Sequence, residues 1–204
     1  LWLDVEKRKY SETLISHCRL DISQMPTLRE GSEPAGVLRK SLAEEWGISP
    51  KVVVSGAGDN AAAACGLGVV SPGDAFVSLG TSGVIFRVTE KFLPEAASGA
   101  HAFCHALPNL WHQMGVTLSA TDSLNWLSEI TGASVASLAN SAKSIDEENS
   151  TLLFHPYLSG ERTPHNDPNA RGGFFGLARR HGHAEMAYSV FEGITYALAD
   201  CLDV

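Results

Sequence analysis

The hydrophobic positions along the chain repeat with two periods, one typical of helices and one typical of strands. Apolar residues recur every three or four positions in 124–130, 135–142 and 186–202, which predicts amphipathic helices. Shorter segments with helical spacing lie at 10–17 and 36–46. Strand-like runs lie between these helical segments.

Runs rich in β-branched and aromatic residues alternate with these helices. Four runs form two pairs, each separated by a short turn: 75–79 with 84–88, and 101–107 with 110–116. Each pair predicts a β-hairpin, and we expect the two hairpins to continue into an antiparallel meander. A fifth run at 151–157 predicts a strand that opens into a polar loop at 158–166, which is too elaborate for a simple turn.

The segment from Val52 to Ala64 joins a strand to a helix. Three valines predict a buried strand, two glycines interrupt it, and an alanine run predicts the helix. Asp59 lies at the junction, where rigid elements on both sides fix a side chain that the loop leaves accessible. Asp59 is therefore either a helix N-cap, worth about 1 kcal/mol, or a reactive carboxylate.

Composition limits the classes of function. The chain has 204 residues, 44% of them hydrophobic, which suits one large domain or parts of two. No apolar run reaches the ~18 residues of a membrane span and no secretory signal is recognisable, so we expect a cytoplasmic protein without a membrane partner. The net charge of −8 argues against a nucleic-acid surface. Because the chain starts at Leu1 without a methionine and ends at Val204 within a helical pattern, we expect an internal segment of a longer protein.

The cysteines and histidines form no recognisable metal motif. The four cysteines lie far apart without a C-x-x-C pair, so we expect reduced core thiols at Cys18, Cys65, Cys104 and Cys201. None of the eight histidines fits H-E-x-x-H or a Cys-His site. Surface or hydrogen-bonded histidines are therefore expected.

Two glycine-containing turns are candidate phosphate sites. The segment 56–61 fits the dinucleotide motif G-x-G-x-x-A, but Asp59 would lie near the pyrophosphate, and a hairpin follows where a second parallel strand is needed. At Gly80-Thr81-Ser82-Gly83, small residues let successive N–H groups converge on an anion, and two hydroxyls add donors. Hairpin tips also take such residues for conformational reasons alone, so a purely structural role stays open.

Several segments together resemble the FGGY family of sugar kinases. They are Gly58-Asp59-Asn60-Ala61-Ala62, the stretch 78–83, Phe103-Cys104-His105-Ala106-Leu107-Pro108, the stretch 156–165, and a C-terminal pattern over 172–192. The resemblance covers essentially the whole chain and implies an α/β protein with the actin-like ATPase (ribonuclease H-like) fold. It implies that residues 1–65 end the first, sugar-binding domain and that residues 66–204 form the first half of the second, ATP-binding domain. A hinge is implied at 66–73.

The resemblance also implies an activity, namely transfer of the ATP γ-phosphoryl group to a sugar hydroxyl. Asp59 would accept the hydroxyl proton and Asn60 would help to place the sugar. The turn of Gly80, Thr81, Ser82 and Gly83 would bind the transferring phosphate. Mg²⁺ is implied by this chemistry, although the sequence identifies no ligand set for it.

The charged pair Glu161 and Arg162 in the polar loop has three interpretations. It is a surface ion pair of little energetic consequence, or Arg162 faces a nucleotide phosphate, or the pair stabilises the loop. Within the family that the chain resembles, Asn60 and His165 imply a ketopentose as the small-molecule partner. Family members that act on glycerol, ribulose or gluconate are alternatives, as is a non-catalytic actin-fold module that binds a sugar or a nucleotide. The oligomeric state is open, with a homodimer as one option.

Overall fold

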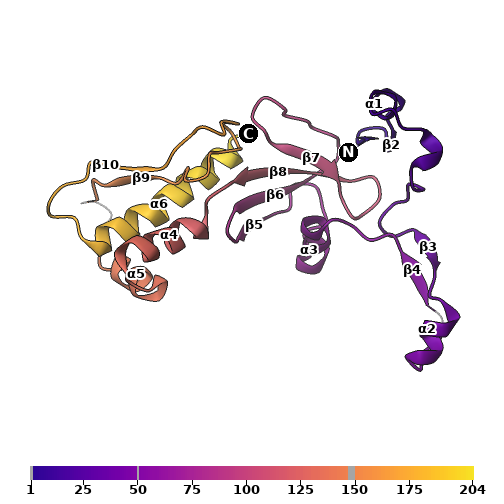
Figure 1. Ribbon diagram of the computed structural model, residues 1–204, viewed down its shortest axis with the longest axis horizontal. Helices are drawn as coiled ribbons and strands as arrows, with labels where there is room; N and C mark the ends of the chain where they lie inside the picture. Colours follow the sequence, from indigo (N-terminus) through magenta and orange to yellow (C-terminus); the bar gives the residue numbers. More distant parts are fainter. Residues whose placement is uncertain (1, 50, 147–149) are drawn as a thin grey trace. The chain divides into compact units, whose positions relative to one another are not determined.

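The computed structural model describes residues 2–49, 51–146 and 150–204. Its helices, drawn in Figure 1, are α1 (Glu12–His17), α2 (Lys40–Glu45), α3 (Asp59–Leu67), α4 (Thr121–Thr131), α5 (Val135–Ala142) and α6 (His183–Leu202), with a 3₁₀ helix at Ile22–Gln24. Its strands are β1 (Leu3–Asp4), β2 (Lys9–Tyr10), β3 (Pro34–Val37), β4 (Val52–Val54), β5 (Ala75–Leu79), β6 (Gly83–Thr89), β7 (His101–Cys104), β8 (Trp111–Thr117), β9 (Leu153–His155) and β10 (Gly173–Phe175). Within these ranges no helix is long and apolar enough to cross a membrane.

The chain divides into two compact units. Unit 1 comprises Leu1–Phe76, Arg87–Leu93 and Ala102–Gln113, and unit 2 comprises Val77–Phe86, Pro94–His101 and Met114–Val204. The boundaries fall inside β5, β6, β7 and β8, so each unit holds part of every strand of the four-stranded sheet. These units do not test the boundary expected after residue 65 between the two domains of the family, which stays a prediction.

Two small hairpins form much of the N-terminal part of unit 1. β1 pairs antiparallel with β2, and β3 pairs antiparallel with β4. The helices predicted at 10–17 and 36–46 are shorter than expected, because Tyr10 belongs to β2 and Pro34–Val37 forms β3. Ser11 starts α1 directly after β2, since its side chain accepts a hydrogen bond from the backbone N of Leu14.

The valine strand β4 is exposed, so the prediction of a buried strand is wrong. Val52, Val53 and Val54 are 61%, 46% and 51% exposed. β4 belongs to a two-stranded sheet with β3, and a two-stranded ribbon buries little surface by itself. The β-branched run therefore predicted the strand correctly but not its environment.

The four-stranded sheet has the order β5-β6-β8-β7. Both predicted hairpins are confirmed, because β5 neighbours β6 across a three-residue connection and β7 neighbours β8. The predicted meander is wrong, since β6 lies beside β8 instead of β7. The long connection over 90–100 allows β7 to occupy the outer edge of the sheet.

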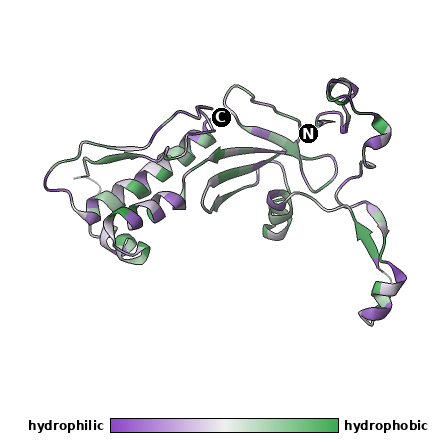
Figure 2. Ribbon diagram, in the orientation of Figure 1, coloured by the Kyte–Doolittle hydropathy of each residue, from purple (hydrophilic) through white to green (hydrophobic). Residues whose placement is uncertain are grey.

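Helices α4, α5 and α6 pack with β9 around a hydrophobic core in unit 2. Its buried residues are Ala120, Leu124, Leu127, Leu138, Ala142, Phe154, Ala187, Val190 and Ile194. Gly193 of α6 lies against the carbonyl oxygen of Phe154, so a larger residue there would collide with β9. Figure 2 shows hydrophobic and hydrophilic residues alternating along α4 and α6. The three amphipathic helices predicted from the sequence are confirmed.

The four cysteines are free thiols, as predicted, but their burial differs from the prediction. Cys201 is buried, and burial raises the pKa of its thiol to about 12. Cys18 and Cys65 are exposed, and Cys104 is partly buried. The expectation of core thiols is therefore wrong for Cys18 and Cys65.

His112 is buried in unit 1 beside two other rings. Its ring centroid is 5.8 Å from that of Phe103 and 6.2 Å from that of His105, and the residue is 4% exposed. Burial and, to a smaller extent, the charge of His105 lower the pKa of His112 to about 4. Protonation of His112 therefore opposes folding.

We expect acid to destabilise the chain through His112. Because the pKa of His112 is lower in the folded state, its contribution is complete above about pH 6.5 and is lost as the pH falls toward about 4. His112→Phe keeps a ring and removes the titration. In urea unfolding across this range, the wild type should lose stability relative to His112→Phe. A difference between the two proteins that does not change with pH would contradict this assignment.

Candidate active site

Asp59 is the first residue of α3, and Gly58 is the N-cap. The Asp59 side chain is exposed, and its Oδ1 accepts hydrogen bonds from the backbone N of Asn60 (2.8 Å) and from Asn60 Nδ2 (3.3 Å). The capping interpretation of Asp59 is therefore wrong. Its Oδ2 accepts no hydrogen bond from the described part of the chain, so the carboxylate is accessible to a ligand.

Helix α3 anchors Asp59 through small residues. Ala61 and Ala64 are 4% and 0% exposed, so one side of the short helix is packed against the protein. Gly68 ends the helix with a φ of 77°, a left-handed conformation that glycine adopts without strain. The alanine run thus holds the helix that carries Asp59 in place.

The loop before Asp59 is held by the turn at residues 30–33. The backbone N of Gly56 donates to the carbonyl oxygen of Gly31 (2.9 Å), and the backbone N of Ser55 donates to that of Glu33 (3.1 Å). The loop is exposed, but these hydrogen bonds fix it on the side of β4, while α3 fixes it on the other side.

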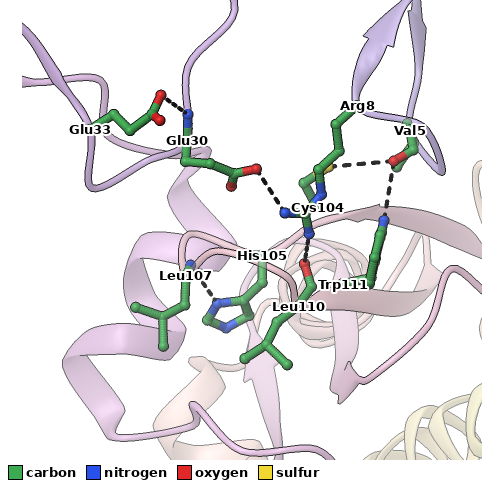
Figure 3. A network of polar contacts seen from close by, with 9 residues as sticks. All are labelled: Val5, Arg8, Glu30, Glu33, Cys104, His105, Leu107, Leu110 and Trp111. Carbon is green, nitrogen blue, oxygen red and sulfur yellow. Dashed lines mark hydrogen bonds and ion pairs between the residues drawn. The ribbon is translucent and has the colours of Figure 1, made fainter.

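A cavity of about 380 Å³ lies beside this loop in unit 1. Its wall includes residues 56–58 of the loop and part of the turn at 30–33, together with Leu3, Arg8, Leu28, Arg29, Cys104 and His105. Figure 3 shows several of these side chains, including Arg8, Glu30 and Glu33, in one polar network. Charged groups of both signs in the wall suit a small polar molecule.

The turn between β5 and β6 belongs to unit 2 and is held by the start of α4. The backbone N of Gly80 donates to the carbonyl oxygen of Ser82 (3.0 Å). The carbonyl oxygen of Gly80 accepts from the backbone N (3.0 Å) and Oγ1 (2.7 Å) of Thr121. A Cβ atom on Gly83 would lie 2.8 Å from Cγ2 of Thr117, so this position requires glycine. The turn therefore has one defined conformation.

The turn offers fewer donors than the sequence suggested. The backbone N of Gly80 is bonded within the turn, and the hydroxyl of Ser82 donates to the carbonyl oxygen of Leu118 (3.3 Å). For the Thr81 hydroxyl and the backbone N–H groups of Thr81 and Ser82, the described ranges contain no hydrogen-bond partner. These three groups are the ones that can bind an anion at the turn.

Glu161 is buried, so its interpretation as part of a surface ion pair is wrong. It is 3% exposed and accepts hydrogen bonds from Thr117 Oγ1 (2.6 Å), the backbone N of Leu118 (3.0 Å) and the backbone N of Arg162 (2.7 Å). Thr117 and Leu118 lead into the segment that contacts the 80–83 turn. Glu161 therefore supports that turn indirectly, through Thr117 and Leu118.

Arg162 has a contact that stabilises the polar loop. Its Nη1 lies 3.1 Å from Nε2 of His101, and burial together with the nearby Arg162 charge lowers the pKa of His101. The next residue, Thr163, exchanges two hydrogen bonds with the backbone of Val116. These contacts fit the loop-stabilising interpretation, and a nucleotide-facing role of Arg162 stays a prediction.

We expect Glu161→Ala to destabilise the protein by roughly 3 kcal/mol or more, because three donors around it lose their acceptor. Glu161→Gln keeps one acceptor oxygen and should lie between the wild type and Glu161→Ala. Glu129→Ala, at an exposed position of α4, is the matched control and should change stability by less than about 0.5 kcal/mol. Equal melting temperatures for Glu161→Ala and Glu129→Ala would refute the supporting role.

Sequence reasoning missed two residues that hold these turns. Arg8 contacts Glu30 and Leu110, which lie 22 and 102 positions away, and no local motif signals such a link. Thr121 lies at the start of α4 and bonds to Gly80. A threonine at a predicted helix start was a usable signal, but only for a cap.

Comparison with known proteins identifies the family. The model of the N-terminal domain of the FGGY family of carbohydrate kinases matches residues 1–66, and the model of its C-terminal domain matches residues 75–204. The chain belongs to the FGGY family of carbohydrate kinases. Members of this family use ATP as the phosphate donor.

Several relatives of this chain are described as xylulose kinases. The chain is 51% identical to the xylulose kinase of Escherichia coli strain K12 and 50% identical to that of Klebsiella pneumoniae, over its whole length and 42% of theirs. A crystal structure described as a xyloylose kinase from Brucella ovis is 49% identical, with a TM-score of 0.94 over 98% of this chain and 41% of that one. The predicted actin-like ATPase fold is confirmed. The chain spans about two fifths of the length of these relatives.

Proposed function

We propose that this chain forms the central part of an ATP-dependent sugar kinase, which converts D-xylulose to D-xylulose 5-phosphate. The single observation that carries the proposal is the 51% identity over the whole chain to a relative described as a xylulose kinase. The exposed Asp59 carboxylate adds support, because one of its oxygens is open to a ligand. The protein would work in the cytoplasm. Its oligomeric state stays open, with a homodimer as one option.

Asp59 is the proposed base, and Asn60 helps to place the sugar. Phosphoryl transfer has a loose transition state in most analyses, so an accurately placed carboxylate matters more than a strongly basic one. The packed helix α3 and the hydrogen-bonded loop before it supply such placement. The side-chain amide of Asn60 donates to Asp59 Oδ1, so the two side chains lie together and could both contact the sugar.

The turn of Gly80, Thr81, Ser82 and Gly83 is the proposed site for the transferring phosphate of ATP. ATP supplies the phosphoryl group when it is bound. The hydroxyl of Thr81 and the backbone N–H groups of Thr81 and Ser82 would bind phosphate oxygens, while Gly80 and Gly83 maintain the tight conformation of the turn. Closure about the segment 66–73 would bring this turn to the sugar and exclude water.

Mg²⁺ is a proposed partner of the nucleotide. In the described ranges, no group of three or more His, Cys, Asp or Glu side chains is arranged to hold a metal ion. These residues therefore do not provide a complete Mg²⁺ site, and the ion would be bound chiefly by phosphate oxygens and water, as Mg²⁺ prefers. Glu161 is fully engaged in the loop and is not a candidate ligand.

A non-catalytic sugar- or nucleotide-binding module is the rival from another class. It shares the fold and the 80–83 turn but does not need an accessible carboxylate at Asp59. A coupled ATPase assay with xylulose, ribulose, glycerol and gluconate separates the candidates. The protein assayed should be an enzyme of full family length that contains this chain. Turnover with xylulose supports the proposal, turnover with another sugar changes the substrate, and binding without turnover favours the module.

We expect Asp59→Asn to lower kcat by about 100-fold or more, the usual contribution of a general base. Sugar affinity and melting temperature should change little, because Asp59 is exposed and does not cap α3. Calorimetric titration and steady-state kinetics measure the two quantities separately. Glu12→Gln, in the first turn of α1, is the matched control and should keep full activity. An Asp59→Asn variant that retains its rate would falsify the base assignment.

We expect Thr81→Ala to raise KM for ATP or lower kcat while leaving sugar affinity unchanged, because its hydroxyl faces no protein partner in the described ranges. Ser82→Ala is the informative comparison, since the Ser82 hydroxyl already donates to Leu118. It should lower stability more than it alters ATP kinetics. Equal losses of sugar and ATP affinity in Thr81→Ala would argue against a phosphate-binding role.

A further inference from the structure

Arg8 joins three segments of unit 1 that are distant in sequence. Its Nη1 lies 2.7 Å from Oε1 of Glu30, and its Nη2 donates to the carbonyl oxygen of Leu110 (2.8 Å). The guanidinium also lies over the ring of Trp111, 4.3 Å from its centroid. Figure 3 shows Arg8 between Glu30 and the β7–β8 connection. One side chain thus links the β1–β2 hairpin, the 30–33 turn and the β7–β8 connection.

The environment of Arg8 differs from that of the other ion pairs. The side chains of Arg8 and Glu30 are 17% and 28% exposed, whereas those of Lys40 and Glu44 are 84% and 67% exposed. Exposed pairs contribute little, but a partly buried guanidinium with two bonded oxygens and an aromatic face has a defined position. The Arg8 contact therefore restricts the geometry of Glu30.

The turn that contains Glu30 is tightly closed. The backbone N of Glu33 donates to the carbonyl oxygen of Glu30 (3.0 Å), and the backbone N of Glu30 donates to Oε2 of Glu33 (2.9 Å). This turn accepts hydrogen bonds from Ser55 and Gly56 in the loop before Asp59. Backbone hydrogen bonds therefore connect the turn that contains Glu30 to the loop.

Gly31 is closely packed between neighbouring stretches of backbone. A Cβ atom at Gly31 would lie 2.6 Å from the carbonyl oxygen of Ala106 and 2.8 Å from that of Gly56. The turn is therefore enclosed between the β7–β8 connection and the loop. The carbonyl oxygen of Leu110 in that connection also accepts from the backbone N of His105 (3.0 Å), so Arg8 binds to an oxygen that is itself fixed.

We propose that Arg8 is a positioning residue that fixes the aim of Asp59 through Glu30 and the 30–33 turn. This inference rests on the proposed function of Asp59 as the base. Arg8 does not contact the loop itself; it holds the turn to which Ser55 and Gly56 are bonded. Since a misplacement of about 1 Å can cost roughly 100-fold in rate, a loosened turn would be felt in kcat.

Amide hydrogen exchange tests the mechanical link without any assay of activity. In Arg8→Met, exchange at the Ser55 and Gly56 amides should accelerate about tenfold or more, because the turn that binds them loses its anchor. The amide of Ile15 in α1 should keep its rate. Lys7→Met removes the neighbouring ion pair with Asp4, whose lysine side chain is 70% exposed, and should change neither.

Kinetics test the consequence for the reaction, in an enzyme of full family length that contains this chain. Arg8→Met should lower kcat per folded molecule by about 10- to 100-fold, with a smaller change in KM for the sugar. Arg8→Lys keeps the charge but not the fork that reaches both Glu30 and Leu110, and should restore part of the rate. Glu30→Ala acts on the same link, so combining it with Arg8→Met should add little.

The outcomes separate the two proposals. Unchanged exchange at Ser55 and Gly56 in Arg8→Met, or equal acceleration at Ile15, would overturn the positioning role. So would a normal kcat per folded molecule in Arg8→Met. Retained turnover in Asp59→Asn would instead overturn the proposed function, and the exchange experiment would still decide whether Arg8 holds the loop.

Discussion

The position of Asp59 depends on a close approach of three stretches of backbone. Gly31 fits between the carbonyl oxygens of Ala106 and Gly56 because it has no side chain. Its own carbonyl oxygen accepts from the backbone N of Gly56, three residues before Asp59. An exposed loop would ordinarily be mobile. Here the backbone contacts restrain it, so the carboxylate is both accessible and fixed, two properties that a catalytic group needs.

The second turn is supported in a different way. The loop before Asp59 is held mainly through backbone hydrogen bonds, whereas the 80–83 turn is held by the start of α4 and, behind it, by the buried carboxylate of Glu161. Glu161 accepts hydrogen bonds from donors that would otherwise be buried without partners, which explains how a carboxylate is accommodated at a buried position. The loop before Asp59 and the 80–83 turn are therefore restrained by independent sets of contacts.

Local patterns in the sequence predicted local structure well and environment poorly. Periodicity located α4, α5 and α6, and the hairpin of β5 and β6, because their signals lie within a few residues of each other. The exposure of β4 and the pairing of β6 with β8 depend on partners elsewhere in the chain. The junction in the sequence was enough to propose Asp59 as a site residue, whereas nothing local pointed to Arg8, since its partners lie 22 and 102 positions away.

Accessibility and restraint at the loop before Asp59 and at the 80–83 turn support one proposal: the Asp59 carboxylate and the 80–83 turn act on the same phosphoryl transfer. A crystal structure of an enzyme of full family length containing this chain, with xylulose and a non-hydrolysable ATP analogue bound, tests it most directly. The account predicts that an Asp59 oxygen lies within hydrogen-bond distance of a sugar hydroxyl and that Thr81 contacts the terminal phosphate. A sugar bound away from Asp59, or a nucleotide phosphate that does not touch the turn, would contradict it.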